Sequence, residues 1–376
     1  MPAQLIWPGK WCHQLYKLFI TLLFIVCPII TQAKEIRYSD VVRLGSYHAP
    51  SEFNWGGAGL ALNSSKDGIY LTNWDEGAQK TAELIFPASL GSTMAVRQSP
   101  VDAYAGKRTQ MGPSNNVYRV GGMMVYQNEL IMTAFAYYHG EPGDVSHFRR
   151  PLALANPNVK GPQRVGSMNA EMYAGYMAEV PEEHRSAIGG SAVTGLCCTS
   201  IISRTSFGPS LHTFDPFAPE QTAMPLVYYP QDHQSLGAYG RPGSHPTFNG
   251  STRITGVAFV GDSVLFIGGT GTGAYCYGTG EECNDPVSPY KGEHAYPYRL
   301  WAWAYRVSDL AAVKNGQRQP WELVPYQNWD LGIAVEPDFG TGGAAYDPVK
   351  QRLYVALRKG FSGGAAEVAV FGVNMK

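Results

Sequence analysis

The residues best suited to chemistry are two histidines that flank one turn. His139 follows the apolar run that ends near residue 138, and His147 opens the run Ser146-His147-Phe148. A strand, a turn and a returning strand would bring both rings to one edge. Histidine readily takes a proton near neutral pH, so either ring is a candidate general base. The alternative is that both rings only hydrogen-bond the backbone of the turn.

Arg204 and Tyr176 are the candidates that would complete such a site. Arg204 follows the apolar Ile201-Ile202 and enters a Gly-Pro turn, where its planar guanidinium can hold a carboxylate. An internal salt bridge is the alternative. Cation, base and acid together are what β-elimination at a uronate needs. Arg204 would neutralise the carboxylate, a histidine would take the C5 proton, and Tyr176 would protonate the leaving oxygen.

A tyrosine-rich stretch favours sugar binding. Five tyrosines fall between Gly268 and Arg299, beside His294. An aromatic ring has an apolar face and, in tyrosine, a polar tip, which suits a sugar. We expect a substrate-binding loop here, with His233 in a further loop; the alternative is that tyrosine only serves as a strand residue. The tyrosines are Tyr275, Tyr277, Tyr290, Tyr296 and Tyr298.

Acidic residues give weaker alternatives. Glycoside hydrolysis would need two carboxylates about 5 to 10 Å apart, for which Asp75, Glu76 and Asp144 are the candidates. Asp75, Glu76 and Asp285 are also weak candidates for holding a structural divalent cation. No sequence motif defines a metal site or a cofactor, so the cofactor stays unknown.

A repeated glycine phrase indicates the elements that position these residues. Small-residue phrases recur at 56–58, 121–123, 189–191, 255–257 and 342–344, at steps of roughly 65 to 90 residues. Each opens a short apolar run that continues as a hairpin, and small residues suit a crowded innermost strand. The pattern predicts an all-β fold, a β-propeller with five blades favoured. Six or seven blades, or a β-sandwich, are the alternatives.

The N-terminal residues have the pattern of an export signal. Lysines precede the apolar stretch Leu18–Ile30, and Thr31-Gln32-Ala33 supplies the small residues of a cleavage site. The apolar stretch is too short for a bilayer, which needs roughly 20 residues. We expect residues 1–33 to be a signal peptide and residues 34–376 to form a single secreted or periplasmic propeller without a membrane span.

Composition argues against two kinds of partner. The net charge is −1 and no cluster of Lys and Arg stands out, so nucleic acid and anionic membranes are poor candidates. Charged residues make up 16% of the chain, against about 25% in typical domains. Many short strands and turns produce this balance.

Four cysteines follow the expected cleavage site, and an even number in an exported chain indicates disulfides. Cys276 and Cys283 are expected to clip a loop. A bond between the adjacent Cys197 and Cys198 would need a distorted peptide. Two free thiols, or one of them pairing elsewhere, are the alternatives. Adjacent cysteines also leave a quinoprotein dehydrogenase as a third option.

Five phrases of the chain are distinctive: Leu196-Cys197-Cys198, residues 203–210, Pro225–Pro230, Tyr275–Gly278 and His294–Tyr298. They resemble a group of exported bacterial β-propeller proteins of unassigned activity, along most of the mature chain. That resemblance implies fold and export but no mechanism. More distantly, the order His147, Tyr176, Arg204 is similar to that of propeller-type ulvan lyases, in which His, Tyr and Arg act on a uronate. That family has seven blades.

The sequence therefore predicts a secreted or periplasmic propeller that acts on an acidic polysaccharide. The hypothesis extends to a lyase that cleaves uronate linkages by β-elimination. A non-catalytic propeller that binds glycan or protein through the tyrosine-rich stretch is the main alternative. A glycoside hydrolase is another.

Overall fold

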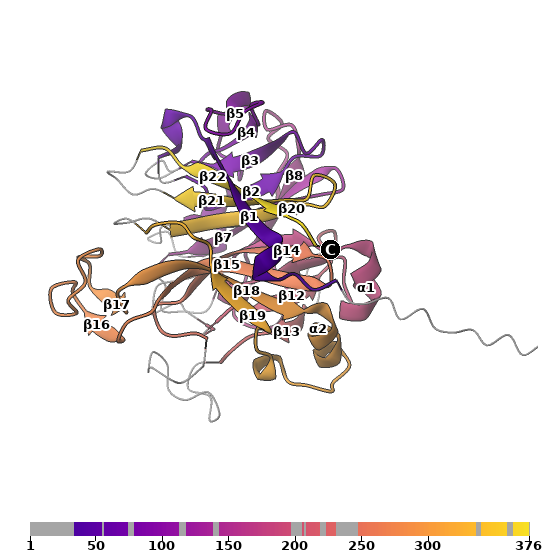
Figure 1. Cartoon of the computed structure of the whole chain (residues 1–376). Helices are drawn as coiled ribbons and strands as arrows, with labels where there is room; N and C mark the ends of the chain where they lie inside the picture. The colour runs from indigo at the N-terminus through magenta and orange to yellow at the C-terminus, as the bar shows by residue number, and fades with distance from the viewer. Residues whose placement is uncertain are drawn as a thin grey trace, which may run out of the picture. The chain divides into compact units, whose positions relative to one another are not determined.

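The computed structural model describes residues 34–54, 56–73, 79–112, 118–137, 143–196, 205–206, 208–218, 223–230, 247–335, 340–358 and 364–375. Within these residues the strands form five four-stranded antiparallel sheets and a separate two-stranded sheet (Figure 1). The innermost strands of the five sheets contact one another in a closed ring. The predicted five-bladed β-propeller is confirmed.

The blades follow chain order, with one insertion and one closure. Blades 1 to 3 use consecutive strands, blade 4 takes β14, β15, β18 and β19, and blade 5 joins β20, β21 and β22 to the N-terminal β1. The bounds of the strands in blades 1 to 3 are β2 Leu60–Leu62, β3 Gly68–Thr72, β4 Thr81–Ile85, β5 Ala95–Val101, β6 Tyr118–Tyr126, β7 Glu129–Ala136, β8 His147–Pro151, β9 Lys160–Gln163, β10 Met177–Glu179, β11 Ala192–Thr194, β12 Leu211–Phe214 and β13 Met224–Val227.

The remaining strands and the helices complete the molecule. The strands are β14 Arg253–Val260, β15 Ser263–Gly271, β16 Cys276–Gly278, β17 Gly292–His294, β18 Tyr298–Arg306, β19 Gln327–Asp330, β20 Gly340–Asp347, β21 Arg352–Arg358, β22 Glu367–Val373 and β1 Val41–His48. The α-helices are α1 Glu182–Ile188 and α2 Val307–Lys314, and the 3-10 helices are η1 Tyr38–Asp40, η2 Ser51–Phe53, η3 Lys107–Met111, η4 Ala170–Met172 and η5 Pro320–Glu322. No helix of the described residues is long and apolar enough to cross a membrane.

Glycines allow the innermost strands to approach one another closely. A Cβ added to Gly121 would lie 1.7 Å from the carbonyl oxygen of Ala174, and one added to Gly342 would lie 1.8 Å from that of Gly57. These distances are shorter than any van der Waals contact, so only glycine fits. We call the end of the propeller at which the innermost strands begin the upper face.

Four of the five glycine phrases lie at the innermost strands, as predicted, and the third does not. Gly189 has φ 82° and ends α1, donating its N–H to the carbonyl of Arg185. Glycine is favoured there because it tolerates the left-handed conformation. The innermost strand of blade 3 is β10, which precedes this helix, and Gly175 takes the hub position opposite Gly122. The prediction for residues 189–191 is therefore wrong.

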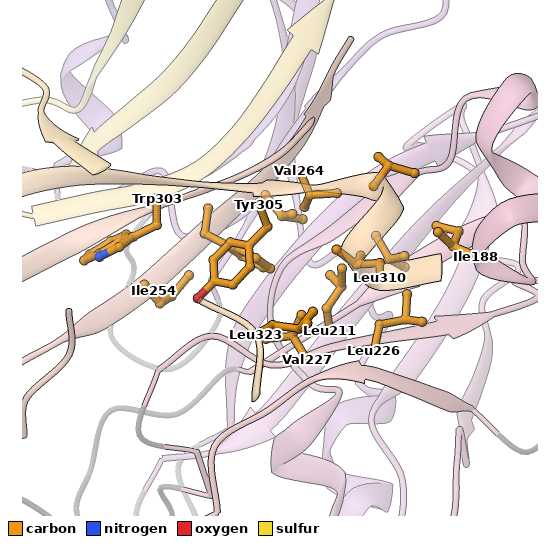
Figure 2. Packing of buried hydrophobic residues seen from close by; sticks show 14 of the residues in the cluster. Ile188, Leu211, Leu226, Val227, Ile254, Val264, Trp303, Tyr305, Leu310 and Leu323 are labelled. Atoms are coloured by element: carbon orange, nitrogen blue, oxygen red, sulfur yellow. The ribbon is translucent and has the colours of Figure 1, made fainter. Parts of the chain in front are cut away.

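Apolar side chains from successive blades fill the space between them. Figure 2 shows one cluster, to which β18 contributes Trp303 and Tyr305 and β13 contributes Leu226 and Val227. Leu310 of α2 closes the same cluster. The longest step between glycine phrases, from β14 to β20, is explained by β16, β17 and α2, which are additions to blade 4.

We expect Gly121→Ala to destabilise the protein, because its methyl group would overlap the Ala174 carbonyl. Overpacking of this kind costs about 1–3 kcal/mol. The matched control is Gly340→Ala, at the start of another innermost strand, where an added Cβ meets nothing within 4 Å. Urea unfolding measures both; equal stability of the two variants would contradict the close approach at the hub.

Candidate functional site

Two arginines from different blades lie at the upper face, near enough for the charge of one to act on the other. Arg119 is the second residue of β6, and Arg358 is the last residue of β21, where it pairs with Gly340 at the start of β20. The side chain of Arg358 passes over Gly57, whose added Cβ would lie 3.9 Å from the Arg358 Cγ. The Arg358 side chain therefore lies beside the segment that leads into blade 1.

The positive charge of Arg358 has no carboxylate partner among the described residues. Burial and the nearby charge of Arg119 lower the pKa of Arg358 to about 10. Tyr137 has the opposite, smaller effect. Arg358 still carries its charge at neutral pH. Two guanidinium groups close enough to repel each other form a site that an oxyanion would stabilise, since a guanidinium fork matches a carboxylate.

Tyr137 supplies an aromatic wall to this site. The guanidinium carbon of Arg119 lies 3.5 Å from the centre of the Tyr137 ring, within range of a cation–π interaction. Tyr137 directly follows β7, and its side chain is 37% exposed. We call Arg119, Arg358 and Tyr137 the arginine site. The sequence analysis did not predict the two arginines of this site. The signal in the sequence was the position of Arg119, just before the glycine phrase of β6.

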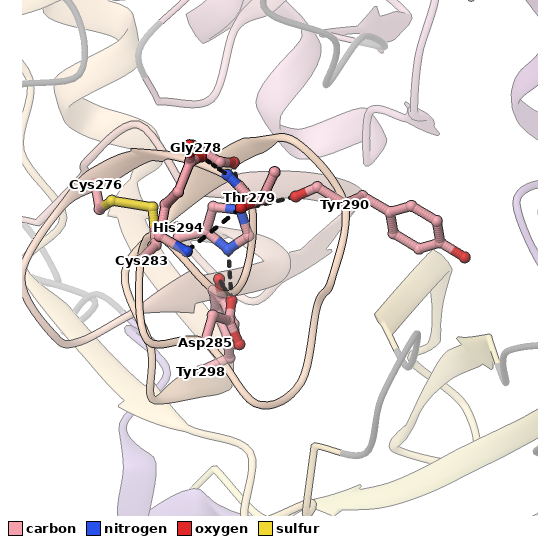
Figure 3. Close-up of a disulfide and its surroundings, with 9 residues drawn as sticks. Cys276, Gly278, Thr279, Cys283, Asp285, Tyr290, His294 and Tyr298 are labelled. Carbon is pink, nitrogen blue, oxygen red and sulfur yellow. Dashed lines mark hydrogen bonds and ion pairs between the residues drawn. A yellow bond between two sulfur atoms is a disulfide. The ribbon is translucent and has the colours of Figure 1, made fainter.

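The tyrosine-rich stretch forms an insertion between β15 and β18 that also leaves the upper face. Gly271 and Tyr298, at its two ends, pair with each other. Its hairpin of β16 and β17 projects from blade 4 (Figure 1). The predicted disulfide between Cys276 and Cys283 is confirmed, and it clips the strand β16 to the following turn (Figure 3).

Three tyrosines of this insertion face solvent. Tyr277 is 50% exposed, Tyr290 61% and Tyr296 43%, and the ring of Tyr290 points away from the body of the insertion in Figure 3. We call these three residues the tyrosine platform. Tyr275 is half-buried.

Two further predicted sugar ligands lie inside the insertion. The Tyr298 hydroxyl donates to Asp285 Oδ2 at 2.5 Å, and His294 is only 2% exposed. Their side chains support the insertion from within. Sugar binding by Tyr275, Tyr277 and Tyr296 stays a prediction.

His147, the predicted base, lies in the core. Its side chain is 3% exposed, with Nδ1 2.9 Å from Ser146 Oγ and Nε2 3.1 Å from Thr194 Oγ1. The Thr194 hydroxyl donates to the carbonyl of Tyr173, so it accepts from Nε2. Burial lowers the pKa of His147 to about 3. A neutral ring with both nitrogens bonded internally is not placed to take a proton from a substrate.

The hydroxyl of Tyr176, the predicted acid, also makes its hydrogen bonds inside the protein. Its hydroxyl donates to the carbonyl of Ser210 at 2.8 Å and accepts from the Ser210 N–H at 3.1 Å. The side chain is 3% exposed, and burial raises its pKa. The described geometry therefore supports a structural role for His147 and Tyr176.

Several predicted residues lie outside the described residues: His139, Arg204, His233, Cys197, Cys198, Asp75 and Glu76. Their roles stay predictions. Asp144, the remaining carboxylate candidate for hydrolysis, has a side chain 76% exposed, with Oδ1 3.6 Å from Arg164 Nη1. Within the described ranges no group of three or more His, Cys, Asp and Glu side chains could hold a metal ion.

No protein-family model matches the chain, and no curated protein sequence does. Solved structures are similar to it in part. The GH43_1 enzyme from Xanthomonas citri is 11% identical, with a TM-score of 0.47 over 86% of this chain and 90% of that chain. An exo-1,5-alpha-L-arabinanase from a bovine ruminal metagenomic library is 10% identical, with a TM-score of 0.41 over 84% of this chain and 92% of that chain.

A protein of unknown function from Dyadobacter fermentans is 8% identical, with a TM-score of 0.38 over 89% of this chain and 99% of that chain. Because these identities and TM-scores are low, no statement about activity rests on them. The resemblance to ulvan lyases stays a prediction.

The buried histidines predict an acid-sensitive fold. Burial lowers the pKa of His147 and of His212, on β12, to about 3, below the ordinary value of 6.5. The unfolded chain therefore binds more protons between pH 6.5 and 3, and stability falls as pH falls through this window, by about 1.4 kcal/mol per pH unit for each ring.

Urea unfolding at several pH values measures this loss. His212→Phe, placed between the rings of Tyr173 and Tyr228, should lose less stability from pH 6.5 to 4 than the unmodified protein. His48→Gln, at a partly exposed position, is the control and should keep the full loss. An unchanged loss in His212→Phe would contradict the role of His212.

Proposed function

We propose that this protein is an exported β-propeller that binds an acidic polysaccharide across its upper face. The observation that carries the proposal is the pair Arg119 and Arg358, two neighbouring cations of which Arg358 has no described carboxylate partner. Export rests on the sequence pattern of residues 1–33. The acidic ligand follows from the charge of the arginine site, and the sugar follows from the exposed aromatic rings on the same face.

The arginine site and the tyrosine platform would each bind a different part of one ligand. A uronate carboxylate has the planar geometry that a guanidinium fork binds through two hydrogen bonds. Tyr137 beside Arg119, and the tyrosine platform on the insertion, offer apolar ring faces to the C–H face of a sugar. A polysaccharide chain is long enough to contact more than one such subsite, which a single sugar is not.

Binding is better supported than cleavage. β-Elimination needs a base and an acid beside the carboxylate, and His147 and Tyr176 are buried and bonded within the core. His139 and Arg204 stay candidates for catalysis by prediction alone. The rival hydrolase hypothesis needs two carboxylates facing one cleft, and Asp144 lies exposed beside Arg164. We therefore propose that the protein binds the polysaccharide. Observed cleavage would add a lyase activity to this proposal.

Arg358→Gln and Arg119→Gln should weaken binding of oligoglucuronate, because each removes charged hydrogen bonds worth about 1.5–3 kcal/mol. The expected increase in Kd is roughly tenfold to a hundredfold. Isothermal titration at two salt concentrations measures it. The unmodified protein should bind more weakly at high salt because ions screen the carboxylates.

Arg43→Gln is the matched control, since Arg43 is an exposed arginine on the outermost strand β1. It should bind as the unmodified protein does. Neutral cello-oligosaccharides should bind weakly to all variants. Equal affinity for the neutral and acidic chains, or no effect of either arginine variant, would contradict the proposal. Formation of unsaturated products during the titration would show cleavage in addition.

A further inference from the structure

His294 lies at the centre of the insertion, and both of its ring nitrogens face hydrogen-bond acceptors (Figure 3). Nδ1 lies 2.7 Å from Asp285 Oδ2. Nε2 lies 3.0 Å from the carbonyl oxygen of Gly278 and 3.0 Å from that of Tyr290. A backbone carbonyl has no hydrogen to donate, so Nε2 must carry one.

Asp285 accepts hydrogen bonds on both of its oxygens. The Tyr298 hydroxyl donates to Oδ2, and the backbone N–H groups of Val287 and Ser288 donate to Oδ1 at 2.9 and 3.2 Å. Burial alone would raise the pKa of Asp285, but the hydrogen bonds from His294, Tyr298 and these N–H groups hold it below its ordinary value. An ionised carboxylate only accepts, so His294 Nδ1 also carries a hydrogen.

With a hydrogen on each nitrogen, the His294 ring is an imidazolium. A neutral imidazole has a single N–H and would turn a lone pair either to Asp285 or to the two carbonyls. Because His294 is 2% exposed and Asp285 6%, water cannot readily replace the lost hydrogen bond. The described conformation of the insertion therefore depends on the positive charge of His294.

We infer that His294 is the positioning residue of the tyrosine platform and that loss of its proton loosens the platform. Nε2 holds the backbone of Tyr290 itself and of Gly278, the neighbour of Tyr277. Two of the three platform residues are thus tied to one charged ring. The consequence for ligand binding rests on the proposed function: where the platform contacts the glycan, affinity falls when the His294 ring loses its proton.

The groups around His294 do not supply a substitute charge. Burial and the hydrogen bond to Asp285 raise the pKa of Tyr298, so its hydroxyl stays protonated. The Glu282 carboxylate accepts from the N–H of Thr279, and the two cysteines are disulfide-bonded. The other charged side chains on the insertion and on β14, β15 and β18 are Glu281, Lys291, Glu293, Arg253, Arg299 and Arg306.

The sign of the pH dependence follows from this arrangement. The protonated His294 ring can donate to Asp285 and to the two carbonyls at once, and the neutral ring cannot. The contribution of Asp285 is complete above its depressed pKa and is lost as pH falls through it. The platform is therefore held in place when Asp285 is ionised and His294 is protonated.

NMR of protein labelled with ¹⁵N-histidine tests the inference without a ligand. We expect both ring nitrogens of His294 to be protonated wherever the insertion keeps the described conformation. The protection factors of the amides of residues 278–290, taken against the intrinsic exchange rate at each pH, should fall as the ring loses its proton. His294→Gln should exchange rapidly at every pH. His184→Gln, which alters another buried histidine bonded to one carbonyl, is the control and should keep the protected insertion.

Binding of oligoglucuronate supplies the functional measurement. In the unmodified protein the Kd should be roughly fivefold or more higher where NMR shows a neutral His294 ring than where it shows a doubly protonated one, within the usual range for coupled equilibria. In His294→Gln it should not vary between those conditions. Two results would overturn the inference. One is a His294 ring with a single protonated nitrogen while the insertion stays protected. The other is a set of protection factors that stay constant while the ring loses its proton. If no glycan binds at any pH but amide protection of the insertion still changes with the protonation of His294, the proposed function fails and the role of His294 stands.

Discussion

The hydrogen-bonded pairing of β1 with β22 is the constraint on which the rest of the molecule depends. It runs from Val41 opposite Val373 to His48 opposite Glu367, and it ties the N-terminal strand to the last three strands. Closure in this way completes the fifth blade and leaves no open gap in the ring. Because the ring closes, all five innermost strands start at one face, and residues distant in sequence come together there.

Arg119 and Arg358 illustrate this consequence. They belong to blades 2 and 5, and each stands at the upper end of its strand. The Arg358 side chain lies beside Gly57, which directly precedes blade 1. The buried His147 and Tyr176 show the opposite case, since their polar atoms bond within the blades and stabilise the scaffold. Polar residue type alone does not distinguish these two roles; the position along a blade does.

Local physical signals made the fold predictable from sequence. Glycines were needed where backbones converge, as at Gly121 and Gly342, and the spacing of Cys276 and Cys283 suited a loop clip. Residues 189–191 were wrongly predicted to open an innermost strand. Glycine is also favoured at a helix C-terminus, which is the position of Gly189. The arginine site could not be predicted, since the proximity of Arg119 and Arg358 depends on ring closure. The imidazolium of His294 depends on acceptors from three other residues, which spacing does not specify.

The central claim is that closure of the ring creates a carboxylate site between two blades. A crystal structure of the protein with sodium glucuronate bound tests it most directly. The account predicts the carboxylate within hydrogen-bonding distance of both the Arg119 and the Arg358 guanidinium groups, beside the Tyr137 ring. A glucuronate bound elsewhere, with Arg358 paired to a carboxylate of the protein itself, would contradict it.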